Sequence, residues 1–198
     1  MTGAPAWAER IVQGQAIIFP TSTLPALGAP PTAQGLDHVF ELKGRGFDRP
    51  VSLAVLGLDD ASRWVTISDG VVDLLESFPR GSLTLVLDAA SPSDPRLGGN
   101  RIAVRVVDHP VAREVIAVTG PLTATSANRS GAPPDRDCRV AAESLGLPVD
   151  SVVPGICPGG SPSTVLDVRT TGGGGVLVSV IREGVIPDNE FSSWMTWR

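Results

Sequence analysis

Short apolar runs alternate along the chain with segments whose apolar residues recur at helical spacing. The strand-like runs are QAIIFPT, VSLAVL, SLTLVLDA, RIAVRVVDHP, PLTATSANRSG, SVVPG, STVLDVR and GVLVSVIREG. The helical segments are AWAERIVQG, LDHVFELKG, SDGVVDLLESF, PVAREVIAVTG and CRVAAESLG. This alternation predicts the α/β class. Some neighbouring strands have no helix between them, so we expect a twisted, mixed sheet flanked by helices.

The run RIAVRVVDHP carries a clear two-residue alternation. It places Arg101, Ala103 and Arg105 on one face and Ile102 and Val104 on the other. One face of this strand is therefore expected to be apolar and the opposite face to present two arginines. The segment LDHVFELKG is expected to end as a helix near Gly44.

Composition narrows the class of protein. The chain has 198 residues and a formal net charge of −5, with 42 % hydrophobic and 19 % charged residues. These values predict a single domain spanning residues 1–198 of an ordinary globular protein. No apolar run is long enough to cross a membrane and the N-terminal residues do not resemble a signal peptide, so we expect a cytoplasmic protein. The acidic balance argues against broad nucleic-acid binding through net charge.

Four polar clusters are expected at the ends of apolar strands. They are Pro20–Thr23, the pair Lys43 and Arg45, Thr125–Asn128, and Ser161–Thr164. We expect Lys43 and Arg45 to lie on one face of an extended segment, where two cations are best accommodated by an anion. Each Ser/Thr cluster alone is typical of a structural cap or turn. Together with the cations, the four favour a site for phosphates and a carboxylate.

Several catalytic and phosphate-binding motifs are absent, and other candidate residues are interpreted as structural. The sequence lacks the phosphate-binding P-loop, the dinucleotide-binding glycine motif and the nucleophile elbow. The run Gly172–Gly175 is expected to be a hairpin loop. His38 and His109 have no companions at metal or triad spacing, and Cys138 and Cys157 are expected to be reduced, buried thiols. No metal site formed by protein side chains is predicted.

The same residues carry a resemblance to a known family. The segments PTST followed by LG, ELKGR…DRPVSL, GSLTLVL, VRVVDHPVA, GPLTATSANRSG and PSTVLDV…IREG resemble the single-domain YrdC-type threonylcarbamoyl-adenylate synthases, from about residue 6 to residue 186. The resemblance implies a twisted sheet with a concave, positive face. It also implies formation of threonylcarbamoyl-AMP and pyrophosphate from L-threonine, bicarbonate and ATP. Mg²⁺ would be bound through the phosphates, and tRNA or tRNA-modification proteins would be partners.

The resemblance also assigns roles to individual residues. Lys43 and Arg45 would face the phosphates and act in catalysis. Ser126, Asn128 and Arg182 would complete the nucleotide site. Arg105 would bind the carboxylate of the amino acid. The amino-acid end of the site would also include Thr23, Thr125 and Ser163.

The chain departs from the family pattern around the predicted amino-acid end. In PTSTLPALG, Ser22 replaces an acidic residue, Pro25 an aromatic residue and Ala26 a glycine. In FPRGSLT, the altered positions are Pro79, Arg80 and Ser82. Three functions therefore stay open from the sequence. They are a threonylcarbamoyl-AMP synthase, a diverged enzyme that carbamoylates another amino acid or amine, and a non-catalytic nucleotide- or RNA-binding protein.

Overall fold

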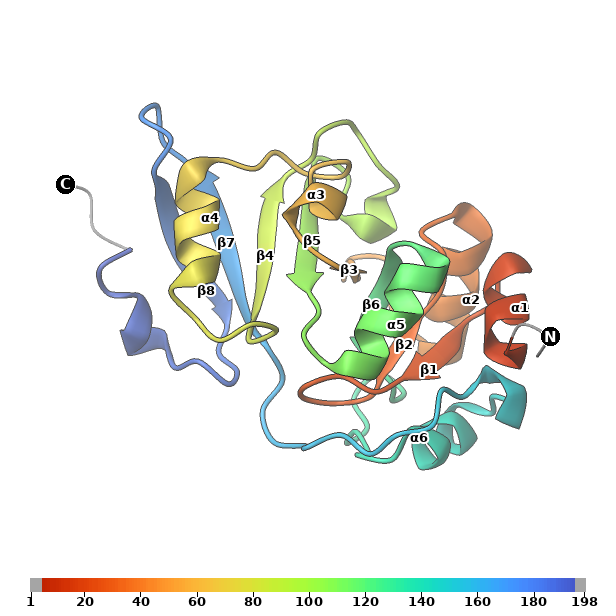
Figure 1. The fold of residues 1–198 in the computed structure, drawn as a ribbon. Helices are drawn as coiled ribbons and strands as arrows, with labels where there is room; N and C mark the ends of the chain where they lie inside the picture. Colours follow the sequence, from red (N-terminus) through yellow and green to blue (C-terminus); the bar gives the residue numbers. More distant parts are fainter. Residues whose placement is uncertain (1–4, 195–198) are drawn as a thin grey trace.

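Eight strands form one twisted, mixed sheet in the computed structural model, which describes residues 5–194 (Figure 1). The strands are β1 Ile17–Phe19, β2 Ala26–Gly28, β3 Ser52–Val55, β4 Leu83–Asp88, β5 Arg101–Val106, β6 Leu122–Ser126, β7 Thr164–Thr170 and β8 Val176–Arg182. Their order across the sheet is β1-β2-β6-β3-β5-β4-β7-β8. The pairs β3/β5 and β4/β7 are parallel and the other neighbours are antiparallel. The predicted α/β class and mixed sheet are confirmed.

Helices and short 3-10 turns flank this sheet. They are α1 Ala6–Val12, α2 Ala33–Lys43, α3 Leu58–Ala61, α4 Asp69–Glu76, α5 Pro110–Thr119 and α6 Cys138–Leu145, with 3-10 turns η1 Pro95–Leu97, η2 Val149–Ser151 and η3 Asp188–Phe191. The end of α2 matters most for the site. Gly44 adopts φ 57°, a left-handed conformation that glycine tolerates best, and so terminates the helix directly after Lys43.

One predicted strand is wrong and one observed strand was not expected. The segment SVVPG contains the turn η2 and only a single bridge, between Ile18 and Val152. Ser151 donates both its backbone N–H and its hydroxyl to the carbonyl of Pro148, and this local turn replaces strand pairing. The short strand β2 forms because its backbone pairs with both β1 and β6, a tertiary effect.

Two apolar clusters lie on opposite faces of the sheet. The first includes Leu53, Leu85 and Val104 and is covered by residues of α2, α4 and α6. The second includes Ala54 and Leu122 and is covered by α1 and α5. In Figure 1, α5 lies over β6, whereas α4 lies against β7 and β8 at the far end of the sheet.

The second cluster does not reach the far half of the sheet. Among the described residues, none from β4, β7 or β8 belongs to it. On this face, side chains such as Val86 and Asp167 stay partly exposed. The sheet therefore has one open face beyond β5, and Arg105 lies at its border with the covered half.

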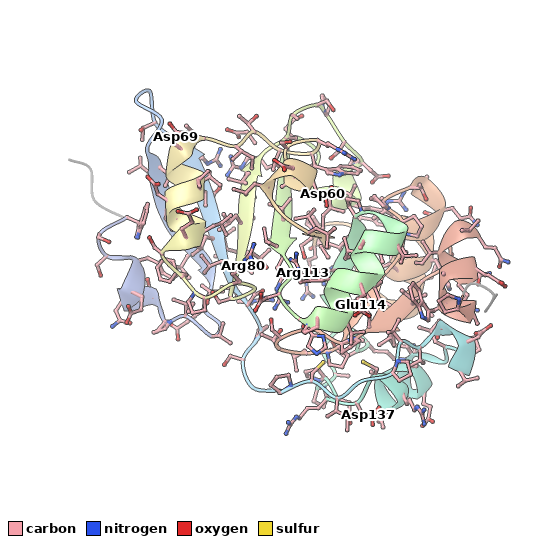
Figure 2. The ribbon with its side chains drawn as sticks, in the orientation of Figure 1. Asp60, Asp69, Arg80, Arg113, Glu114 and Asp137 are labelled. Carbon is pink, nitrogen blue, oxygen red and sulfur yellow. The ribbon has the colours of Figure 1, made fainter. Side chains whose placement is uncertain are left out.

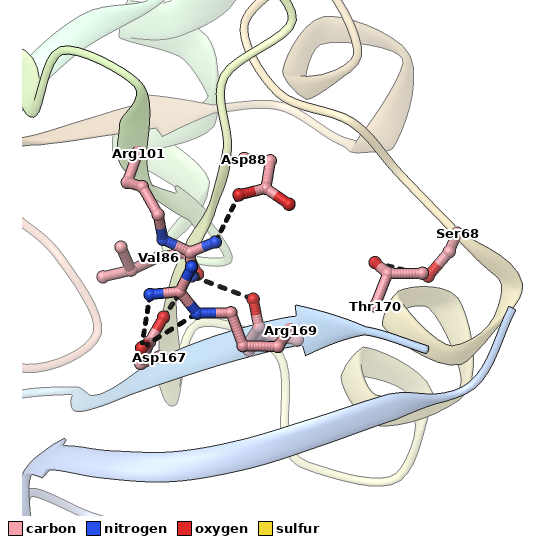
Figure 3. A network of polar contacts seen from close by, with 8 residues as sticks. Ser68, Val86, Asp88, Arg101, Asp167, Arg169 and Thr170 are labelled. Atoms are coloured by element: carbon pink, nitrogen blue, oxygen red, sulfur yellow. Dashed lines mark hydrogen bonds and ion pairs between the residues drawn. The ribbon is translucent and has the colours of Figure 1, made fainter. Parts of the chain in front are cut away.

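An ion-pair network occupies one end of this open face (Figure 3). Arg101 on β5 pairs with Asp88 on β4 at 2.5 Å and with Asp167 on β7. Arg169 also contacts Asp167, at 3.2 Å. The guanidinium of Arg101 donates further to the carbonyls of Val86 and β7. Arg101 is thus paired with two carboxylates and two carbonyls at this end of the open face.

Candidate functional site

Lys43 connects the end of α2 to the loop that follows β6. Its Nζ donates to the carbonyl oxygens of Ser126 at 2.5 Å and Asn128 at 2.7 Å. The carbonyl of Lys43 in turn accepts the N–H of Ser130. The side chain is only 3 % exposed, and this burial, with the charges of Arg45 and Arg49, lowers the pKa of Lys43 to about 8.

Arg45 points to a different part of the chain, so the predicted placement of both cations on one face of an extended segment is wrong. The reason is the left-handed Gly44, which ends the helix and reverses the chain between them. The guanidinium of Arg45 donates to the carbonyls of Arg49 and Pro50. Burial and the charge of Arg49 lower the pKa of Arg45. The charge of Arg45 still acts on Lys43, although the two side chains contact different segments.

The loop after β1 directs hydroxyls toward β5. Thr21 holds the loop closed by donating to the carbonyl of Leu24 at 2.7 Å. The hydroxyls of Ser22 and Thr23 then each accept a hydrogen bond from Nη2 of Arg105 at 3.2 Å. This contact joins the first polar cluster to the arginine that the sequence assigned to the carboxylate.

Arg105 has only neutral hydrogen-bond partners. Its Nε and Nη2 donate to the carbonyl of Gly81 at 3.0 and 2.8 Å. Its Nη1 forms no hydrogen bond with any residue in the described range. Burial, followed by the charge of Arg182, lowers the pKa of Arg105 to about 10. A partly buried guanidinium with a free nitrogen and no carboxylate is prepared for an anion.

Arg182, the last residue of β8, contacts the fourth polar cluster. Its Nη2 donates to the carbonyl of Ser163 at 2.7 Å. Ser163 is buried, and its hydroxyl is hydrogen-bonded to that of Thr84 at 2.8 Å. Burial is the main cause that lowers the pKa of Arg45 and of Arg105, and the positive charge of Arg182 contributes to both shifts.

The loop after β6 supplies polar atoms that lack protein partners. Asn128 donates through Nδ2 to the carbonyls of Arg129 and Ala132, which shapes the loop. Its Oδ1 and the hydroxyl of Ser130 are buried without a hydrogen-bond partner among residues 5–194. Buried polar atoms are normally satisfied, so these two suit a polar ligand.

Thr125 and Ser126 lie on opposite faces of the sheet. Thr125 pairs with Leu27 and Ser126 with Ala26, so alternation directs Ser126 to the face that carries Arg105. The predicted division, with Ser126 at the nucleotide and Thr125 at the amino acid, does not follow these faces. Their roles stay predictions.

The cations of the site share one property: none forms an ion pair within the described part of the chain. They are Lys43, Arg45, Arg105 and Arg182. Four arginines elsewhere do pair with aspartate, namely Arg10, Arg96, Arg101 and Arg169. Gathering unpaired cations costs free energy unless an anion binds among them. The protein therefore has a local basic site although its net charge is −5.

Sequence reasoning missed three contributors. The carbonyl of Gly81 orients Arg105, the hydroxyl of Thr84 orients Ser163, and the carbonyl of Lys43 holds Ser130. Gly81 and Thr84 both lie in the altered segment FPRGSLT. The departure of this segment from the family pattern was the sequence feature that could have pointed to them. The remaining contact, between the carbonyl of Lys43 and the N–H of Ser130, depends on tertiary packing.

Other predicted features behave as structural elements. His38 accepts the backbone N–H of Ala16 through Nδ1, and the glycine run at 172–175 is the hairpin loop between β7 and β8. Cys138 and Cys157 are buried free thiols, as expected, and Sγ of Cys157 accepts the N–H of Thr21. Within residues 5–194, no group of three or more acidic, histidine or cysteine side chains is placed to hold a metal ion. No helix in that range is long and apolar enough to cross a membrane.

The fold and these contacts define an α/β protein that, within residues 5–194, carries cations without ion pairs and buried polar atoms without protein partners. Residues 9–184 match the Sua5/YciO/YrdC family, described as telomere recombination. The chain belongs to this family.

Curated relatives of the chain are named as enzymes. Threonylcarbamoyl-AMP synthase of Marinobacter nauticus is 31 % identical over 170 residues, covering 82 % of this chain and 89 % of the relative. Threonylcarbamoyl-AMP synthase of Xanthomonas campestris pv. campestris is 30 % identical over 169 residues, covering 81 % and 90 %. The chain is therefore a member of an enzyme family.

Solved structures show the same fold. P. abyssi Sua5 complexed with L-threonine matches with a TM-score of 0.81 and 26 % identity, covering 98 % of this chain and 59 % of the Sua5 chain. The present chain thus spans less than two thirds of that protein. E. coli YciO matches with a TM-score of 0.78 at 22 % identity, covering 94 % of this chain and 90 % of YciO.

The single lysine of the chain allows a direct test of the site's electrostatics. We expect isotope-labelled lysine to give one side-chain NMR signal that titrates near pH 8, and its midpoint to rise when pyrophosphate or ATP is added. Because the folded pKa lies below the ordinary 10.5, the contribution of Lys43 to the free energy of unfolding should rise with pH between about 8 and 10.5. Replacing Arg45 with glutamine should raise the midpoint. A midpoint near 10.5 that ignores pyrophosphate would contradict this picture.

Proposed function

We propose that this chain joins an amino acid, bicarbonate and ATP into a carbamoyl-adenylate and releases pyrophosphate. The relatives are named for the threonine version of this product, and threonylcarbamoyl-AMP is the form that would feed the modification of a tRNA adenosine. The observation that carries the proposal is a set of four cations, Lys43, Arg45, Arg105 and Arg182, none of which forms an ion pair within residues 5–194, in a chain of this family.

The proposed chemistry needs no protein nucleophile. The neutral amine and bicarbonate form a carbamate and water. An oxygen of the carbamate then attacks the α-phosphorus of ATP, the bond to the β-phosphate oxygen breaks, and pyrophosphate leaves. The work of the site is to hold several anions together and to stabilise the charge that develops on phosphorus.

Each side chain has a part in this proposal that its position allows. Lys43, Arg45 and Arg182 offer positive charge to the triphosphate, and Lys43 also fixes the loop that carries Ser126 and Asn128. Arg105 binds the α-carboxylate through its free Nη1. Hydroxyl groups of Thr23 and Ser163 line the amino-acid end.

Magnesium fits this site only through its substrate. None of these four cations forms an ion pair with a carboxylate within residues 5–194, and no group of three or more acidic, histidine or cysteine side chains gathers there, so the protein offers hard oxygen ligands poorly. Mg²⁺ would be held by the phosphates, where it supplies charge neutralisation.

The test is pyrophosphate release from ATP and bicarbonate with each amino acid in turn, with mass spectrometry of the product. Release that depends on both bicarbonate and an amino acid supports the proposal. Bound ATP without release under any condition would leave a non-catalytic nucleotide-binding protein, and retention of tRNA in its place would point to an RNA-binding protein.

Replacing Asn128 with alanine should weaken ATP binding with little loss of folding stability. Oδ1 of Asn128 is free for a ligand, while its Nδ2 bonds stay within a surface loop. Calorimetry of ATP binding and a thermal melt measure the two effects separately. Unchanged ATP affinity combined with a collapsed melting temperature would make the loop purely structural.

A further inference from the structure

The turn before β4 presents an additional cation at the amino-acid end. The N–H of Ser82 bonds to the carbonyl of Pro79 at 3.1 Å, and the hydroxyl of Ser82 donates to the same carbonyl. Gly81 has φ 74°, so Arg80 and Gly81 form the centre of a type II turn, in which the third residue requires a positive φ. Arg80 therefore projects from a closed turn whose backbone is fixed.

This turn is part of the Arg105 subsite. The carbonyl of Gly81 accepts from Arg105, and a side chain on Gly81 would meet the hydroxyl of Ser22 at 2.8 Å. Figure 2 shows Arg80 beside the ends of β4 and β5. Arg80 is thus one residue from the atom that orients the predicted carboxylate ligand.

No acidic side chain within residues 5–194 forms an ion pair with Arg80 or Arg105. Ser22 stands against Arg105 with a neutral hydroxyl at 3.2 Å. Asp108 lies beside Gly81 but forms no ion pair with Arg80 or Arg105. Arg80 is exposed and has no hydrogen-bond partner in the described range.

The charges of the proposed substrates leave Arg80 without a counterpart. The triphosphate and the carbamate account for Lys43, Arg45 and Arg182, and the α-carboxylate accounts for Arg105. A neutral side chain on the amino acid offers nothing to Arg80, whereas a side-chain carboxylate offers a charge-assisted partner.

We infer that the amino acid used by this site carries an acidic side chain, with Arg80 as the residue that determines this specificity. The inference rests on the proposed function. The α-carboxylate binds Arg105, the side-chain carboxylate binds Arg80, and the neutral Ser22 leaves both guanidinium groups available. The substrate class is therefore aspartate or glutamate.

The test compares acids with their neutral isosteres. Pyrophosphate release is measured with aspartate against asparagine, with glutamate against glutamine, and with threonine. The expected kcat/KM ratio of acid to amide is about ten or more, the scale of one charge-assisted pair. Arg80→Gln should bring this ratio close to one by lowering kcat/KM with the acidic substrates. Arg63→Gln, at an exposed arginine outside the site, is the matched control and should leave the ratio as it is.

A second variant tests the charge argument by adding a negative charge to the site. Ser22→Asp places a carboxylate beside Arg105 and should lower the use of acidic substrates relative to threonine. A wild-type preference for threonine or for the amides, or an Arg80→Gln enzyme with an unchanged ratio, overturns the inference and leaves the proposed function standing. Absence of pyrophosphate release with every amino acid overturns the proposed function, and the inference with it.

Discussion

Replacing Arg105 with methionine should reduce pyrophosphate release by about a thousandfold or more, since it removes the charged contact that we propose for the substrate carboxylate. The melting temperature should stay close to that of the wild type because two effects oppose each other. Methionine relieves the burial of a cation that has only neutral partners, and it leaves the carbonyl of Gly81 without its donor. Steady-state kinetics and a thermal melt of the purified variant measure both quantities.

Arg101→Met is the matched control for this prediction. Arg101 stands four residues away on the same face of β5, but it pairs with Asp88 and Asp167. Its removal leaves two carboxylates without their partner, so we expect a loss of about 1 to 3 kcal/mol in the free energy of unfolding. If Arg105→Met keeps its activity, or melts as Arg101→Met does, Arg105 is a structural residue.

The behaviour of β5 shows what the sequence could predict. Its two-residue alternation was sufficient to assign Ile102 and Val104 to the core and Arg105 to the other face, and the structure confirms both. The alternation does not tell which arginine is paired. That difference depends on the register of β4 and β7, which brings Asp88 and Asp167 to Arg101 and no acid to Arg105.

The error at Lys43 and Arg45 has a different origin. The pattern of LDHVFELKG predicted a helix that ends near Gly44, and the structure confirms it. A helix ending there places Lys43 in its last turn, so an extended segment through Lys43 contradicted a prediction already made. The contact of Lys43 with the loop after β6 could not be predicted, because it joins residues 83 and 85 positions apart.

This contact makes Lys43 the second residue with a large expected effect. Lys43→Ala should lower ATP use by about ten- to a thousandfold, as loss of a charged phosphate contact would. The structure adds a second reason: without its Nζ, the carbonyls of Ser126 and Asn128 lose the donor that holds their loop to α2. We therefore expect a higher KM for ATP together with a lower kcat, measured by pyrophosphate release.

Arg45→Ala separates these two contributions. Arg45 carries charge near the same site, but its guanidinium bonds only to carbonyls of its own loop, so its removal leaves the loop after β6 in place. We expect a similar ten- to thousandfold loss of ATP use from its charge alone, without the added loop disorder. Proteolysis of that loop, or its amide exchange, should therefore increase in Lys43→Ala and stay at the wild-type level in Arg45→Ala. Wild-type pyrophosphate release in either variant would remove that residue from the site, and equal loop protection in both would remove the positioning role of Lys43.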